Sequence, residues 1–111
     1  MKQRTVQDPA QVANVSIKGL ARAFAALGTE AAAEAFLRDL CTPAELEAMA
    51  DRWAVIPYLL SGVPYRDIHD RTGVSVTTIG RVARTYETGT GGYAGAVEKL
   101  GLSTLRTGRS S

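Results

Sequence analysis

The segment from residue 65 to residue 84 constrains the fold of this chain more than any other, because its pattern predicts two short helices joined by a tight turn. Gly73 lies between the two helical patterns, where glycine adopts a left-handed conformation at little cost. Ser75 is a favoured N-cap for the second helix, because its hydroxyl can accept a hydrogen bond from a free backbone N–H. Apolar side chains that recur at helical spacing give the two helices an inward face: Ile68, Ile79, Val82 and Tyr86. We therefore expect a helix–turn–helix over about residues 64–86.

The opposite face of the second helix carries side chains suited to DNA. Its residues are Thr77, Thr78, Arg81 and Arg84. Hydroxyl and guanidinium groups can contact base edges and phosphates, and no carboxylate occurs between Ser75 and Thr85. A face that is merely solvated usually mixes both signs of charge. The apolar pattern fits two helices that only close a core equally well, so the outward face is what favours DNA binding.

Composition and charge agree with a small helical DNA-binding domain. The 111 residues suffice for one domain with a modest core, and aromatic residues make up only 6% of the chain. We therefore expect an all-α protein with a core of Leu, Ile, Val and Ala. Residues 1–61 carry 6 Lys/Arg against 7 Asp/Glu, whereas residues 62–111 carry 7 against 4. The helix–turn–helix thus lies in the basic half, as a surface that faces phosphates requires.

The helical periodicity predicts one domain over residues 13–102. Residues 1–12 lack this periodicity and are expected to form a flexible arm, and residues 103–111 a disordered tail. The glycine-rich stretch 88–92 lacks the lysine and the preceding strand of a phosphate-binding loop, so we expect a plain flexible loop there. A short sixth helix follows this loop.

Three helices are predicted before the helix–turn–helix. Gly28 ends the first, Thr29 caps the second, and Pro43 occupies the first position of the third. The first two helices carry apolar faces formed by Ile17, Leu20, Phe24 and Leu27, and by Phe36 and Leu40. A monomer of this size has little with which to cover these faces, so we expect a two-fold homodimer.

A set of short motifs between residues 40 and 100 is shared with a known family. The motifs are Leu40-Cys41-Thr42-Pro43-Ala44-Glu45, Arg52, Leu59-Leu60-Ser61-Gly62, Gly73, Thr78-Ile79-Gly80-Arg81 and Gly91-Gly92-Tyr93. On these motifs the chain resembles the tryptophan repressor superfamily, and within it a repressor-related branch more closely than the tryptophan-sensing repressor. The resemblance covers about residues 13–100 once the helices are matched.

The resemblance implies a six-helix, all-α fold whose N-terminal helices interlock with those of a second chain. The contacts to double-stranded DNA that it implies come from both helices of the helix–turn–helix: Arg66, His69, Val76, Thr77, Thr78 and Arg81. The phosphate-contacting lysine of the family is His69 in this chain, so the charge at that position depends on pH.

The resemblance also bears on a small-molecule effector. In the tryptophan-sensing members the amino acid lies between two arginines, which match Arg52 and Arg81. The glycine that follows the second arginine is Val82 here, and a serine that meets the amino group of the ligand is Thr85. Because a β-branched side chain at position 82 occupies space that the indole needs, we expect that L-tryptophan is not the corepressor. Whether another effector exists stays open.

Two hypotheses of different classes follow. The first is a homodimeric, sequence-specific DNA-binding regulator that acts as a repressor. The second is a helical protein–protein adaptor that uses the surface around Trp53 and Pro57. An enzyme is disfavoured, because His69 is the only histidine and no cluster of Cys or carboxylates has metal-ligand spacing. We expect no cofactor and no membrane segment, and the single Cys41 suits a reducing cytoplasm.

Overall fold

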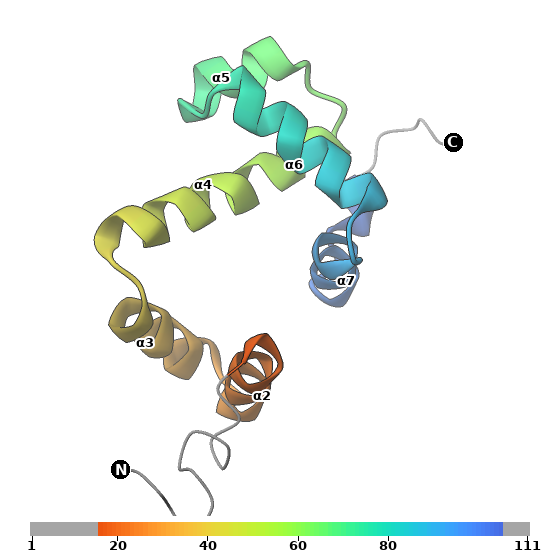
Figure 1. Ribbon diagram of the computed structural model, residues 1–111. Coiled ribbons are helices and arrows are strands. Elements are labelled where there is room, and N and C mark those ends of the chain that lie inside the picture. Colours follow the sequence, from red (N-terminus) through yellow and green to blue (C-terminus); the bar gives the residue numbers. More distant parts are fainter. Residues whose placement is uncertain (1–15, 106–111) are drawn as a thin grey trace, which may run out of the picture. The chain divides into compact units, whose positions relative to one another are not determined.

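The structure, a computed structural model, describes residues 16–105, which form helices joined by short connections (Figure 1). This part contains no strand and consists of the following elements: α2 (Ile17–Leu27), α3 (Glu30–Leu40), α4 (Pro43–Leu60), α5 (Tyr65–Thr72), α6 (Val76–Thr88), α7 (Gly92–Lys99) and the 3-10 helix η1 (Leu102–Leu105). The all-α class and the six α-helices are thus confirmed. The helices belong to two units, one ending at Pro43 and the other beginning at Ala44.

The first unit is a pair of helices, α2 and α3, with strong local start and stop signals. The hydroxyl of Thr29 accepts a hydrogen bond of 3.1 Å from the backbone N–H of Ala32 and so caps α3. Gly28 ends α2 with a left-handed φ of 77°, as its position in the sequence predicts. The rings of Phe24 and Phe36 meet edge to face at 5.0 Å. Neither helix buries a side chain completely.

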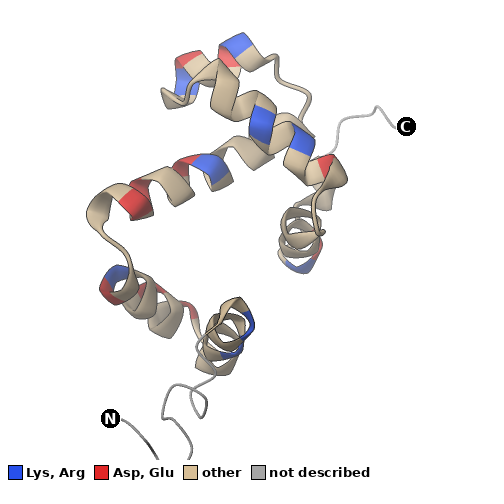
Figure 2. Ribbon diagram, in the orientation of Figure 1, with Lys and Arg blue, Asp and Glu red and all other residues tan. Residues whose placement is uncertain are grey.

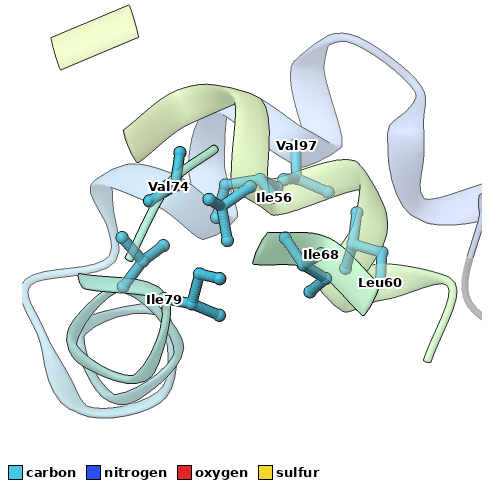
Figure 3. Packing of buried hydrophobic residues seen from close by; sticks show 8 residues of the cluster. Ile56, Leu60, Ile68, Val74, Ile79 and Val97 are labelled. Carbon is cyan, nitrogen blue, oxygen red and sulfur yellow. The ribbon is translucent and has the colours of Figure 1, made fainter. Parts of the chain in front are cut away.

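The second unit contains the hydrophobic core, which is built from aliphatic side chains only (Figure 3). Its members come from α4 to α7 and from the turn between α5 and α6: Val55, Ile56, Leu60, Ile68, Val74, Ile79, Val82 and Val97. The apolar pattern of the helix–turn–helix predicted three of these positions, Ile68, Ile79 and Val82. Helical periodicity missed Val55, which is fully buried beside Ile56, because two adjacent buried residues on α4 lie outside a single stripe with a helical period.

Aromatic side chains extend this core at its margin. The rings of Trp53 on α4 and Tyr93 on α7 are stacked with their centroids 6.4 Å apart and their planes within 9° of each other. The guanidinium carbon of Arg71 lies 5.9 Å from the centre of the Tyr58 ring. Both contacts join helices within the second unit.

The structure differs from the predicted boundaries near the C-terminus. The predicted loop over residues 88–92 is shorter, because α6 continues to Thr88 and α7 begins at Gly92. Helix η1 lies across the predicted domain end at residue 102 and occupies the first part of the predicted tail. The predicted arm, residues 1–12, lies outside the described residues, as do residues 106–111.

Candidate nucleic-acid interface

The turn between α5 and α6 is held by hydrogen bonds from its own residues. Gly73 has a left-handed φ of 79°, and its N–H donates to the carbonyl of His69 at 2.7 Å. The hydroxyl of Thr72 donates to the carbonyl of Ile68 at 2.7 Å and accepts from the N–H of Val74 at 3.1 Å. The predicted pair of helices with glycine at the turn is therefore confirmed.

The start of α6 is capped as the sequence predicts. The hydroxyl oxygen of Ser75 accepts a hydrogen bond of 3.1 Å from the N–H of Thr78. The same hydroxyl donates to the Thr78 hydroxyl oxygen at 3.0 Å. Thr78 itself is half-buried on α6. The cap therefore orients one of the residues expected to contact DNA.

The imidazole of His69 belongs to this turn as well. Its Nδ1 lies 2.8 Å from the carbonyl oxygen of Val74, beyond the bend of the chain. Because a carbonyl only accepts, Nδ1 carries the hydrogen and donates. Nε2 then carries a second hydrogen only in the imidazolium form. The ring itself remains exposed.

The residues predicted to contact DNA lie on the exposed side of α5 and α6. Arg66 is exposed on α5. On α6 the exposed residues are Val76, Thr77, Arg81 and Arg84, with Val76 exposed to 48%. Figure 2 shows two basic bands along α6 and an acidic band only near its end. These side chains are therefore exposed on the two helices of the helix–turn–helix.

The residues matched to the effector site of the family differ in their exposure. Val82 is 1% exposed and belongs to the same core cluster as Ile79. Thr85 is exposed on α6, and Arg52 is half-buried on α4. Within residues 16–105 the ion pair that forms is Arg38–Glu34, at 2.8 Å, and Arg52 takes part in none.

Sequence reasoning missed two residues of this surface, Tyr65 and Gly80. A Cβ placed on Gly80 would lie 3.6 Å from Nη1 of Arg84 and 3.8 Å from Cε2 of Tyr65. Tyr65 begins α5 and is 41% exposed. No local signal marks this contact, because the packing of α5 on α6 creates it.

The surface around Trp53 and Pro57, expected for an adaptor function, is partly covered by contacts within the second unit. Trp53 is half-buried and its ring stacks on Tyr93, and Pro57 is half-buried inside α4.

Among the described residues, no three of His, Cys, Asp and Glu are close enough to hold a metal ion. The same residues contain no helix of the length and hydropathy that a membrane span requires.

This architecture defines an all-helical protein of the TrpR-like fold, with α5 and α6 as its two-helix surface element. The model of the Trp repressor protein family matches residues 15–101, and the chain belongs to this family. The expected family is thereby confirmed. It is a family of regulators.

Three relatives illustrate the similarity. The chain is 37% identical over 65 residues to the uncharacterized protein YerC of Bacillus subtilis strain 168, a match that covers 59% of this chain and 62% of YerC, less than two thirds of its length. A TrpR-like protein from Eubacterium eligens has a crystal structure with a TM-score of 0.70 at 34% identity, over 77% of this chain and 88% of that one. A TrpR-like structure from Staphylococcus aureus reaches 0.72 at 24% identity, over 87% and 97%, and shows the fold alone.

Proposed function

We propose that this protein is a sequence-specific DNA-binding regulator that represses transcription by occupying an operator. The observation that carries the proposal is the outward face of α6. Thr77, Arg81 and Arg84 are exposed there, and the face holds no carboxylate between Ser75 and Thr85. Membership of the Trp repressor protein family supports the same function. A regulator of this kind acts in the compartment that contains the chromosome, so we place it in the cytoplasm.

In this proposal α6 enters the major groove and α5 crosses the backbone. Thr77, Thr78 and Arg81 lie near the start of α6 and read base edges, for which guanidinium and hydroxyl groups are suited. Arg84 lies one turn further along and contacts phosphate, as do Arg66 and the protonated form of His69. Val76 at the N-terminus of α6 supplies an apolar contact to a thymine methyl.

We propose that the DNA-binding form of the protein is a homodimer. Two copies related by a two-fold axis would present their α6 helices about one DNA turn apart, which matches a palindromic operator. The exposed apolar side chains of α2 and α3 support this assembly, because Ile17 on α2 is 88% exposed and Leu40 on α3 is 48% exposed.

The test is selection of duplexes from a random pool, followed by a salt titration of the selected DNA. Binding through several phosphates should weaken steeply as salt rises, whereas an apolar protein interface would respond little. Replacing Arg81 with Ala should cost about 1–3 kcal/mol if the guanidinium reads a guanine, and should relax the preference at that base pair. Failure to enrich any sequence, together with unchanged affinity for Arg81→Ala, would contradict the proposal.

A further inference from the structure

Gly80 occupies an unusual place on the outward face of α6. Gly80 and Arg81 lie three and four residues after Thr77, and Arg84 lies four and three residues after them, so the four residues share one face of the helix. This is the face on which the proposed DNA contacts lie. Three of its four members have side chains that can reach DNA, and the fourth has none.

The fold does not require glycine at this position. Gly80 lies inside α6 and does not have the left-handed φ that favours glycine elsewhere in the chain. A Cβ at Gly80 would meet its neighbours at 3.6 and 3.8 Å, which are ordinary van der Waals distances. Glycine weakens a helix relative to alanine, because it gains more freedom on unfolding. Alanine would therefore fit and strengthen α6.

Two side chains border the space that this missing Cβ leaves. We call this space, lined by Gly80, Tyr65 and Arg84, the Gly80 notch. Nη1 of Arg84 lies within 4 Å of the Cβ position, so the guanidinium is folded back along α6 by about one turn. Cε2 of Tyr65, on the neighbouring helix α5, lies within 4 Å of the same point. The Tyr65 ring and the Arg84 guanidinium therefore border the same point beside Gly80.

We propose that the Gly80 notch is where DNA comes closest to α6, and that Tyr65 is the positioning residue for Arg84 at this contact. The proposal rests on the proposed DNA-binding function. A methyl group in the notch would hold the DNA away from the helix and lengthen the hydrogen bonds of Thr77 and Arg81. Without the Tyr65 ring, the Arg84 guanidinium would be less ordered in the free protein. Ordering it on DNA would then cost free energy and weaken binding.

The first experiment is Gly80→Ala, for which the proposal expects opposite effects on stability and on binding. The melting temperature should rise by about 2–6 °C, because alanine is the better helix former. The affinity for a short duplex that the wild-type protein has selected from a random pool should fall about tenfold. Gly95→Ala is the matched control, since Gly95 lies inside α7 with no atom within 4 Å of its Cβ position. It should raise the melting temperature and leave DNA affinity unchanged.

The second experiment is a double-mutant cycle on Tyr65 and Arg84. Because Arg84 contacts phosphate in the proposed function, Tyr65→Ala should weaken binding to the selected duplex and to a scrambled duplex by the same factor. Tyr65→Phe should keep both affinities, because the ring does the positioning. The double variant with Arg84→Ala should bind no worse than Arg84→Ala alone. Two outcomes would overturn this proposal and leave the proposed function intact. The first is a Gly80→Ala variant that binds the selected duplex as tightly as the wild-type protein does. The second is a double variant of Tyr65 and Arg84 whose loss of affinity equals the sum of the two single losses. A wild-type protein that selects no duplex would overturn both.

Discussion

The His69 ring has two roles. It forms a hydrogen bond within the turn, and it belongs to the residues proposed to contact DNA. Its Nδ1–H is engaged with the Val74 carbonyl at 2.8 Å, so Nε2 is the atom left for a phosphate. In the neutral ring Nε2 is an acceptor and cannot bind an anionic oxygen. Only the imidazolium donates from Nε2, and it adds one positive charge near Arg66 on the same helix, beside the carboxylate of Asp70.

We predict that the protein binds DNA more tightly with the imidazolium form of His69 than with the neutral ring. Protonation supplies an Nε2–H donor and a cation, so the bound state favours the proton, and the effect is present at low pH and lost as the pH rises. Each additional phosphate contact should steepen the slope of log affinity against log salt by about 0.9. The measurement is a pair of salt titrations, one at low pH and one at high pH.

His69→Asn is the control for this prediction. The asparagine amide can donate to the Val74 carbonyl from a similar position and does not ionise. Because His69 is the only histidine of the chain, the variant should bind with the same salt slope at both pH values. If the slope of log affinity against log salt is the same at both pH values for the wild-type protein, His69 does not contact phosphate and only stabilises the turn.

Val82 carries the prediction about the effector. It is 1% exposed and packed in the core, and its β-branched side chain stands where the tryptophan-sensing members have glycine. An indole there would have to displace packed atoms, and overpacking of this kind costs about 1–3 kcal/mol. We predict that L-tryptophan does not bind and does not strengthen DNA association. Calorimetry would refute this if it showed micromolar affinity together with tighter DNA binding in the presence of the amino acid.

Among the elements, α6 depends on its N-cap. We predict that Ser75→Ala lowers the free energy of unfolding by about 1 kcal/mol, because the N–H of Thr78 loses its acceptor. The Thr78 hydroxyl also loses the donor that orients it, so DNA affinity should fall more than stability alone explains. Thermal unfolding and DNA titration measure the two effects. Ser75→Thr keeps the hydroxyl and should retain both, and a loss as large as that of alanine would argue against the cap.

The helix boundaries that the sequence predicted have causes within a few residues. Gly28 and Gly73 adopt the left-handed conformation that ends a helix, and Ser75 and Thr29 accept hydrogen bonds from the following turn. Such signals are local, so they survive in a sequence that is considered alone. The short connection between α6 and α7 has no comparable signal, because a run of small residues is compatible with several loop lengths.

In the candidate site, too, the features with a local sequence signal were predictable and those that depend on packing were not. The outward position of Thr77, Arg81 and Arg84 follows from helical periodicity once the inward face is known. The contact around Gly80 and Tyr65 depends on how α5 crosses α6, which no local pattern records. The bond from His69 to Val74 depends on the path of the turn in the same way.

At the scale of the whole molecule, the core lies in one unit, and the other unit has exposed apolar side chains on both of its helices. The eight buried aliphatic residues all belong to the unit that begins at Ala44. In the unit that ends at Pro43, Ile17 is 88% exposed and Leu40 is 48% exposed. Faces of this kind are usually covered by another chain.

We predict that the protein is a homodimer at micromolar concentration, to be measured by sedimentation. Leu20→Glu places a carboxylate in the apolar face of α2 and should shift the equilibrium to monomer, with weaker DNA binding because one half-site reader is lost. Arg22→Glu introduces the same group two residues later, on the opposite side of the helix, and should remain dimeric. A wild-type protein that sediments as a monomer would contradict the prediction.

The placement of the aromatic residues makes the two units optically distinct. The single tryptophan and all four tyrosines lie between residues 53 and 93, whereas the first unit carries only the two phenylalanines. Tryptophan emission therefore reports only on the unit with the core, and it is sensitive to whether α7 stays stacked against α4 through Trp53 and Tyr93. Far-ultraviolet circular dichroism records the helices of both units. Unfolding curves from the two signals will coincide if the units melt as one cooperative body and will separate if α2 and α3 melt on their own.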